Sequence, residues 1–208
     1  MSSGYILPGT FLLARTLYNR GMICTAEGRP TMSDEELVLC AQGGNADALD
    51  ELIRRWYPGI HAFCCRRVQS DTLGADLTQD TFLKLVAALP RYRAKGSFKS
   101  WLFTIAANTC TDAVRRSRPT ADLDELAEVL PDARAAGFAG QVEAGEAVRR
   151  ALADLPDVQR EALILRYYHD FEIEEIARIT HTLAPTVKTR LWRGLRRMKL
   201  LLGEEWKE

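Results

Sequence analysis

The helical spacing of apolar residues is the feature that most limits the folds open to this chain. Between residues 33 and 116, apolar side chains return every three or four positions, as at Leu49, Leu52 and Ile53. Residues 144–202 repeat the pattern, and runs of β-branched residues are scarce. This period gathers apolar side chains on one face of an α-helix, whereas a half-buried strand needs strict alternation. The sequence therefore predicts an all-α protein.

Breaks in this pattern divide the chain into two small helical domains. The 208 residues are enough for two separate cores. Residues 119–143 lose the helical period, contain Pro and Gly, and are acidic, which predicts a flexible linker. The first domain then covers residues 32–118 and the second covers residues 144–208. Residues 1–31 have few acids and weak periodicity, so we expect a disordered N-terminal extension.

The first predicted helix has a recognisable N-terminus. Ser33 precedes three consecutive acids, and a Ser N-cap with carboxylates in the first turn stabilises a helix start. Because this signal directly follows Met32, both Met32 and Met22 are candidates for the natural start of the chain.

Charge alternates in blocks along the chain, although the totals of 28 basic and 28 acidic residues cancel. Residues 33–80 hold nine acids and four bases, and residues 119–146 hold seven acids and one base. Residues 91–118 hold seven bases and one acid, and residues 181–199 hold six bases and no acid. The blocks predict two separate cationic surfaces joined by an acidic connector.

Five cysteines are scattered at positions 24, 40, 64, 65 and 110. Their odd number and irregular spacing argue against a disulfide scaffold and predict a reducing, cytoplasmic location. No apolar run approaches the roughly 20 residues that a membrane helix needs, so we expect no membrane insertion.

One group of potential ligands stands out among these cysteines. His61, Cys64 and Cys65 have the spacing of one helix face, and with Cys40 as a possible fourth ligand they could bind a soft metal or sense oxidants. Buried cysteines more often serve as small apolar side chains, and we predict no metal, no cofactor and no catalytic residue. A Cys/His nucleophile would need a third, orienting group, and none is recognisable.

The most cationic segment is APTVKTRLWRGLRRM at residues 184–198. On a helix, Val187 and Leu191 share an apolar face, while Lys188 and Arg193 point elsewhere. The helical segment EIEEIARI precedes it by about five residues, which is the arrangement of a helix-turn-helix. A helix anchored by an apolar stripe can present its first turns to a DNA major groove. A solvated cationic face would explain the charges alone, but not the preceding helix and turn.

Two longer segments resemble bacterial sigma factors. The pair LPDVQREALILRYYHDFEIEEIARI and PTVKTRLWRGLRRMK resembles their promoter-reading C-terminal domain. The pair DLTQDTFLKLVAALPRYR and GSFKSWLFTIAANTCTDAVRR resembles their N-terminal core domain. The matches come in the family's order over residues 33–202, with only a short linker between them. This layout resembles the extracytoplasmic-function (ECF) subfamily of the sigma-70 family.

The resemblance implies an all-helical protein that binds core RNA polymerase and directs it to promoter DNA, with an anti-sigma protein as a further partner. Asp76, Gln79 and Asp80 match the helix that meets the clamp helices of the polymerase, although carboxylates also favour a helix N-terminus without any partner. The acidic linker would thread the polymerase cleft. The alternative is a helix-turn-helix regulator that acts without core polymerase, but the segments matching the core domain would then have no role.

The segment that matches the opening of the −10 element combines aromatic, amide and basic residues. Melting a duplex needs a pocket for an extruded base and a cationic track for the backbone. The spacing of Trp101 to Ile105 also suits a core position. The resemblance assigns to the −10 element Phe98, Lys99, Trp101 and Asn108, with Arg115 and Arg116 as phosphate contacts.

The residues that match the −35 reading surface lie in the second domain. Members of the family commonly place Gly in the turn before the last helix, and His181 stands there in this chain. Since a left-handed conformation is costly for a residue other than Gly, we expect either strain or a reshaped turn. Arg190 could instead pair with a Glu of the preceding helix. The matching residues are Arg166, Thr186, Lys188, Thr189, Arg190, Trp192 and Arg193.

Overall fold

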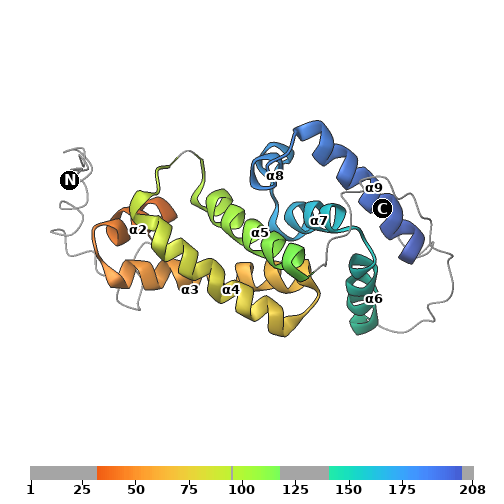
Figure 1. The fold of residues 1–208 in the computed structure, drawn as a ribbon, viewed down its shortest axis with the longest axis horizontal. Coiled ribbons are helices and arrows are strands. Elements are labelled where there is room, and N and C mark those ends of the chain that lie inside the picture. The colour runs from red at the N-terminus through yellow and green to blue at the C-terminus, as the bar shows by residue number, and fades with distance from the viewer. Residues whose placement is uncertain (1–31, 95, 118–140, 203–208) are drawn as a thin grey trace.

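The computed structural model describes residues 32–94, 96–117 and 141–202, and these residues form helices and no strand. The predicted all-α fold is confirmed (Figure 1). We refer to α2–α5 as the N-terminal half and to α6–α9 as the C-terminal half. The predicted extension 1–31 and most of the predicted linker lie outside the described residues. The elements are α2 (Asp34–Gln42), α3 (Ala46–Val68), α4 (Asp71–Ala88), the 3-10 turn η1 (Leu89–Arg91), α5 (Phe98–Ser117), α6 (Gln141–Ala153), α7 (Asp157–His169), α8 (Ile173–Ile179) and α9 (Ala184–Leu202).

Capping side chains fix the starts of the first helices. The Ser33 hydroxyl accepts a hydrogen bond from the backbone N–H of Glu36 at 3.3 Å, and the Glu36 carboxylate accepts from the N–H of Ser33 at 2.8 Å. This capping box confirms the predicted helix start. Asn45 then caps α3 by accepting from the N–H of Ala48 at 3.1 Å, and α3 continues through Pro58.

The N-terminal half is held together by close helix packing. The longest helix, α3, packs against α2, α4 and α5. Gly74 of α4 allows an especially close approach to α3, because a Cβ at this position would lie 2.5 Å from the Sγ of Cys65 and 2.7 Å from its Cα. Any larger residue would push the two helices apart.

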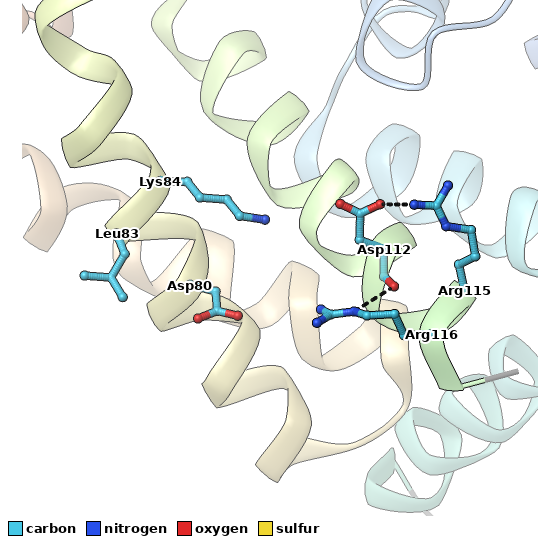
Figure 2. Close-up of a pocket in the computed structure, with 6 residues that line it drawn as sticks. All are labelled: Asp80, Leu83, Lys84, Asp112, Arg115 and Arg116. Carbon is cyan, nitrogen blue, oxygen red and sulfur yellow. Dashed lines mark hydrogen bonds and ion pairs between the residues drawn. The ribbon is translucent and has the colours of Figure 1, made fainter.

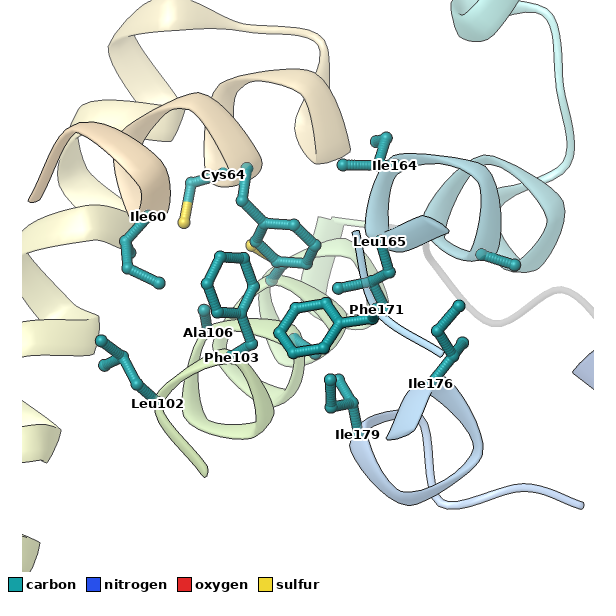
Figure 3. Close-up of a cluster of buried hydrophobic side chains, with 14 of the residues drawn as sticks. Ile60, Cys64, Leu102, Phe103, Ala106, Ile164, Leu165, Phe171, Ile176 and Ile179 are labelled. Atoms are coloured by element: carbon teal, nitrogen blue, oxygen red, sulfur yellow. The ribbon is translucent and has the colours of Figure 1, made fainter. Parts of the chain in front are cut away.

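The two halves are packed against each other, so they are not independent bundles in this conformation. Helix α3 contacts α7, and α5 contacts α8. Figure 3 shows Phe103 of α5 facing Phe171, which lies in the turn after α7, with Leu165 of α7 next to Phe171. The Phe103 and Phe171 rings meet edge to face with centroids 5.0 Å apart, and both side chains are fully buried. Burying a side chain of this size contributes roughly 2–3 kcal/mol.

Helix length and apolarity also bear on membrane association. Within the ranges that the structure describes, no helix is both long enough and apolar enough to cross a bilayer.

Candidate nucleic-acid interface

The turn between α8 and α9 takes the left-handed conformation at His181, with φ of 50°. The N–H of Thr182 donates to the carbonyl of Ala177 at 2.9 Å, and the N–H of His181 donates to that of Arg178 at 3.4 Å. These two bonds satisfy the last carbonyls of α8 in the manner of a Schellman motif. Of the two outcomes expected for a turn without Gly, the structure shows the strained left-handed residue.

The apolar stripe of α9 anchors this helix on α7 and α8. Val187, Leu191 and Met198 are buried, and Gly194 packs on Leu163, where an added Cβ would lie 3.0 Å from the Leu163 Cδ1. The opposite face therefore projects outward from the C-terminal half. This orientation follows from the helical period and agrees with the predicted split between Val187 and Lys188.

Most of the residues matched to the −35 surface are accessible on this outer face. Lys188, Thr189, Trp192 and Arg193 are exposed, and Thr186 and Arg190 are half-buried. Trp192 is 60% exposed, and the guanidinium of Arg196 lies 5.6 Å from the centre of its ring. The first turns of α9 thus present a cationic surface with an exposed aromatic ring at its centre.

Arg166 differs from the other members of this set. From α7 its Nη1 donates to the carbonyl of Phe171 at 2.9 Å and to the Oε2 of Glu172 at 3.1 Å. These bonds hold the turn into α8. Arg166 therefore supports the geometry of the helix-turn-helix, and its guanidinium is only partly available for a phosphate.

The residues matched to the −10 element divide into buried and exposed groups. Phe98 is 1% exposed and packs edge to face on Tyr92, so its ring cannot stack on a base in this conformation. Trp101 is half-buried, with its ring centroid 4.2 Å from that of Tyr92. Asn108 and Arg116 are exposed.

A shallow hollow of about 490 Å³ lies between α4 and the end of α5 (Figure 2). Asp112 accepts a hydrogen bond from Arg115 at 3.1 Å through its carboxylate, and its backbone carbonyl accepts from Arg116 Nε at 3.2 Å. Lys84 Nζ donates to the Thr109 hydroxyl at 2.9 Å, which fixes a further cation at the junction of the two helices. No signal in the sequence points to Lys84, since nothing in the spacing links it to α5.

The residues matched to polymerase binding form a free surface on α4. Asp76, Gln79 and Asp80 are exposed, and neither carboxylate forms an ion pair with a described residue. Leu83 is 68% exposed and Val86 is also exposed, and both continue the same helix face. We call these five residues the α4 stripe. Their spacing of three, four and seven residues places Leu83 and Val86 on the face of the polar members, but the helical period alone does not show that this face is exposed.

Lys99 lies at the contact between the halves. Its ammonium group lies over the Phe171 ring and donates a hydrogen bond to the backbone carbonyl of His169. The neighbouring Ser100 hydroxyl donates to the Oε1 of Glu175 in α8 at 3.0 Å. A residue matched to the −10 element is therefore occupied by contacts with the C-terminal half.

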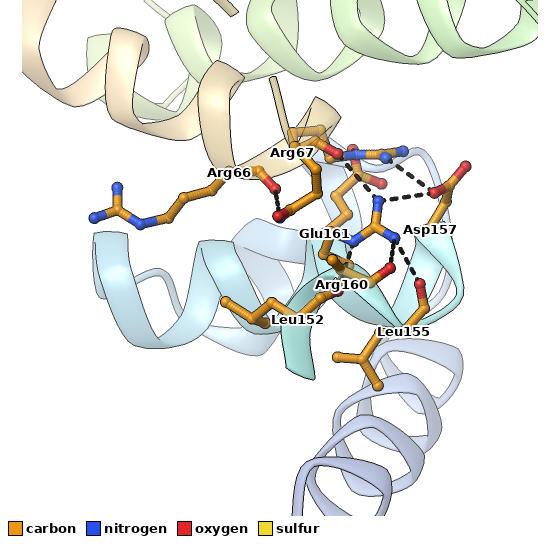
Figure 4. Close-up of polar contacts among 9 residues, drawn as sticks. Arg66, Arg67, Leu152, Leu155, Asp157, Arg160 and Glu161 are labelled. Atoms are coloured by element: carbon orange, nitrogen blue, oxygen red, sulfur yellow. Dashed lines mark hydrogen bonds and ion pairs between the residues drawn. The ribbon is translucent and has the colours of Figure 1, made fainter. Parts of the chain in front are cut away.

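A buried polar network extends this contact at the end of α3 (Figure 4). Arg67 is 3% exposed, and its Nε donates to the Oε1 of Glu161 at 3.3 Å. Arg160 donates to the carbonyl of Arg67 at 3.2 Å and to the Oδ1 of Asp157 at 3.0 Å. Its guanidinium also binds three carbonyls around the α6–α7 corner, those of Leu152, Ala153 and Leu155.

His169 is half-buried at the same contact. Its ring lies between Phe63 and Phe103, with centroids 5.9 Å and 4.6 Å away. Burial, together with the positive charges of Arg66 and Lys99, lowers the pKa of His169 to about 4. The imidazole is therefore neutral near pH 7 and acts as part of the apolar packing.

The structure does not bring together the side chains of the possible metal or oxidant site at His61, Cys64 and Cys65. Cys65 Sγ lies 3.6 Å from His61 Nε2, whereas Cys64 is fully buried in the core. The three side chains therefore do not face one common position. Within the described part of the chain, no three His, Cys, Asp or Glu side chains are grouped as a metal site would require.

Sequence comparisons match both halves. Residues 52–120 match the family described as Sigma-70 region 2, and residues 145–198 match Sigma-70, region 4. The chain is 33% identical over 178 residues to the ECF RNA polymerase sigma factor SigM of Mycobacterium tuberculosis, covering 85% of this chain and 88% of SigM. It is 32% identical over 166 residues to the RNA polymerase sigma factor CarQ of Myxococcus xanthus, covering 77% of this chain and 92% of CarQ.

A solved structure agrees with these relatives. The sigma factor RpoE of Bartonella quintana, in complex with the anti-sigma factor NepR, superposes with a TM-score of 0.59 at 26% identity, covering 75% of this chain and 97% of RpoE. The two regions occur in the same order as the two halves of the fold, and the alignments span most of each relative. The chain belongs to the ECF family of RNA polymerase sigma factors.

Proposed function

We propose that this chain binds core RNA polymerase in the cytoplasm and directs it to promoters, with residues 32–118 serving the polymerase and the −10 element and residues 144–208 serving the −35 element. The observation that carries the proposal is the outer face of α9. Its cations project outward while its apolar stripe is locked in the C-terminal half. This is the geometry with which a recognition helix enters a major groove.

Within the −35 unit, Lys188, Arg193 and Thr189 supply the contacts to DNA. Lys and Arg suit phosphates and guanine edges, and a Thr side chain can reach a base through its hydroxyl or its methyl group. Trp192 adds an exposed ring that can pack on the sugar–phosphate backbone. Arg166 contributes by holding the turn between α7 and α8, since its guanidinium already binds Phe171 and Glu172.

The α4 stripe is the surface that docks on the polymerase. Two free carboxylates and an amide attract basic groups, while Leu83 and Val86 offer apolar area to bury. A helix-turn-helix regulator that acts without the polymerase would gain nothing from this exposed mixture. The stripe therefore favours the sigma-factor function over that alternative.

Asn108, Arg115 and Arg116 are exposed and can contact the −10 element in this conformation. Asn108 can hydrogen-bond to a base edge, and the two arginines can contact phosphates. Lys99 can join them when its ammonium group leaves the Phe171 ring, so promoter binding through Lys99 competes with this contact between the halves. Trp101 can stack on a base if its contact with Tyr92 opens.

An anti-sigma protein is the expected regulatory partner. Bartonella quintana RpoE, which shares this fold, was solved in complex with the anti-sigma factor NepR. A protein of this class would act on the present chain by covering the α4 stripe or the outer face of α9.

Run-off transcription tests this function directly. Purified chain is added to sigma-free core polymerase on a library of promoter fragments, and the transcripts are sequenced. We expect initiation at defined fragments only when the chain is present. Core binding is measured separately by pull-down. DNA binding without core binding would support the independent regulator, and the absence of specific initiation would refute the sigma-factor function.

A further inference from the structure

The segment matched to the −10 element is joined directly to the helix-turn-helix. The Ser100 hydroxyl of α5 donates to the Oε1 of Glu175 in α8 at 3.0 Å, and the ammonium group of the neighbouring Lys99 lies over the Phe171 ring. Helices α5 and α8 pack on each other along this contact (Figure 1). The two units proposed to read separate promoter elements are therefore held side by side.

This contact limits the distance between the two proposed DNA-reading surfaces. Asn108 follows Ser100 on α5, and their Cα atoms are roughly 12 Å apart at 1.5 Å per residue. The turn between α8 and α9 is closed by backbone hydrogen bonds, so it is not extended. Along the path through Ser100 and Glu175, the Cα atoms of Asn108 and Lys188 are therefore less than roughly 50 Å apart.

The two promoter elements lie further apart than this limit. The centres of elements at −10 and −35 are separated by about 25 base pairs, which is roughly 85 Å along a straight duplex. Only a strong bend in the intervening DNA would bring both within reach, and bending costs deformation energy. The packed chain therefore cannot occupy both elements of a straight promoter at once, although the outer face of α9 stays accessible for one of them.

Buried charges hold the halves in this arrangement (Figure 4). The Nε of Arg67 in α3 lies 3.3 Å from the Oε1 of Glu161 in α7, and both side chains are buried. We call Arg67 and Glu161 the latch pair. Removal of one partner from a buried ion pair leaves an uncompensated charge, whereas replacement of both by apolar residues is often tolerated. The packed arrangement should therefore be sensitive to loss of a single charge.

The surface proposed for polymerase binding stays accessible while the halves are packed. Asp76, Gln79 and Asp80 of the α4 stripe are exposed. Helix α4 packs on α3, α5 and η1, all within the N-terminal half. Core polymerase can therefore dock on the closed chain before the halves separate.

We propose that the packed arrangement is an autoinhibited state of the free chain, in which the latch pair and the Ser100–Glu175 bond prevent simultaneous contact with both promoter elements. This inference rests on the proposed function, which assigns α5 to the −10 element and α9 to the −35 element. Core polymerase docks on the α4 stripe first, and the opening that follows frees Lys99. Without polymerase, the chain binds one element and gains nothing from the second.

Binding to two DNA fragments tests the proposal, with the promoter taken from the run-off experiment. One fragment carries the −35 element and a pre-melted −10 element, and the other carries the same −35 element with a scrambled −10 sequence. The free full-length chain should bind both equally. Glu161→Gln removes one charge of the latch pair and should bind the two-element fragment roughly tenfold more tightly than the other, because linked sites add avidity. Its radius of gyration in small-angle scattering should also increase.

The double variant Arg67→Met with Glu161→Leu is the matched control, since it replaces both buried charges by apolar side chains. It should keep the compact radius and show no gain from the −10 element. Circular dichroism checks that the helices persist in each variant. If Glu161→Gln does not fold, Ser100→Ala decides in its place, because it removes only the bond to Glu175 and should open the chain to a smaller extent.

A tenfold preference for the two-element fragment in the free, unsubstituted chain would overturn the proposal, and that comparison needs no variant. So would a folded Glu161→Gln chain whose radius and preference are both unchanged, or one that opens and still gains nothing from the −10 element. Run-off transcription with core polymerase separates this failure from failure of the proposed function. A chain that initiates specifically with polymerase but uses both elements when free is a sigma factor without autoinhibition.

Discussion

The ammonium group of Lys99 lies 4.4 Å from the centre of the Phe171 ring, which joins a residue matched to the −10 element to the turn that precedes α8. A cation over an aromatic face in a partly buried site is worth about 1–2 kcal/mol. The same ammonium donates to the His169 carbonyl. The packing of the two halves therefore competes with a phosphate contact by Lys99.

Removing the Phe171 ring should open the contact between the halves. Phe171→Ala deletes a fully buried ring from the interface with Phe103, at a cost of about 3–5 kcal/mol. We expect the radius of gyration in small-angle scattering to increase while the circular dichroism stays helical. Tyr167→Ala, which removes an exposed ring four residues earlier, is the matched control and should leave the radius unchanged. A folded Phe171→Ala chain of unchanged radius would contradict the assigned role of the ring.

Removing a cation from α9 should weaken promoter recognition and spare polymerase binding. Lys188→Ala and Arg193→Ala each delete an exposed side chain on the outer face. A loss of roughly 1 kcal/mol, or about fivefold in affinity for a promoter fragment, is expected for each. Binding of the holoenzyme to DNA and of the chain to core are measured separately. As the control, Arg54→Ala removes an exposed cation from α3. If a folded Lys188→Ala chain lost promoter binding and core binding equally, the assignment of α9 to DNA alone would be refuted.

Two glycines in neighbouring helices should respond oppositely to the same substitution. Gly74→Ala places a Cβ against the backbone of Cys65 and should lower the free energy of unfolding by about 1–3 kcal/mol. Gly59→Ala meets nothing within 4 Å and should raise it by roughly 0.5–1 kcal/mol through helix propensity. Urea unfolding of the two variants gives both values. Similar effects in the two variants would mean that α3 and α4 are not as closely packed as described.

Glycine at position 181 should relieve the strain of the turn. His181 has φ of 50°, a conformation that costs a residue with a Cβ about 1–2 kcal/mol. His181→Gly removes that cost but adds chain entropy to the unfolded state, so a net gain of about 0.5–1 kcal/mol is expected. His181→Ala keeps the Cβ and should show no gain. Thermal unfolding of the three chains compares them, and a gain in His181→Ala equal to that in His181→Gly would exclude strain as the cause.

The half-buried His169 should make stability depend on pH. Its folded pKa of about 4 lies below the usual 6.5, so between these values the unfolded chain binds more protons than the folded chain. The free energy of unfolding should therefore fall by roughly 2–3 kcal/mol as pH drops from above 6.5 to about 4. Arg66 and Lys99 oppose protonation, and Asp170 favours it slightly. Urea unfolding gives the free energy of unfolding of the chain and of His169→Gln at several pH values. Between pH 5 and 6.5 this free energy should change more steeply with pH in the unsubstituted chain than in His169→Gln. An equal pH dependence in the two chains would contradict this assignment.

Local signals in the sequence predicted the helices and the outer face of α9 well. The Ser33 cap and the opposite faces of Val187 and Lys188 each depend on neighbours within a few residues. Such features follow from the helical period and from capping chemistry. His181 is a further local signal. The sequence shows a residue other than Gly at this turn position, and the cost of a left-handed conformation there follows directly from its Cβ.

The contact between the halves could not be predicted in this way. The helical period shows that one face of α5 and one face of α7 are apolar, but not that these faces meet. Phe98 illustrates the limit, since an aromatic residue at the start of a basic helix reads equally well as a stacking platform or as core. Arg67 and Glu161 are 94 positions apart, and no local pattern pairs them.

The network around Arg160 has a consequence for how the halves come apart. Its guanidinium and that of Arg67 are bonded to groups that are shielded from solvent. When the halves separate, each freed carbonyl, carboxylate and guanidinium has to be hydrated, so separation takes up water. Osmolytes such as sucrose, which are excluded from newly exposed protein surface, should therefore favour the state in which the halves are packed together. The osmotic state of the surroundings then helps to determine the fraction of molecules in which the halves are separated.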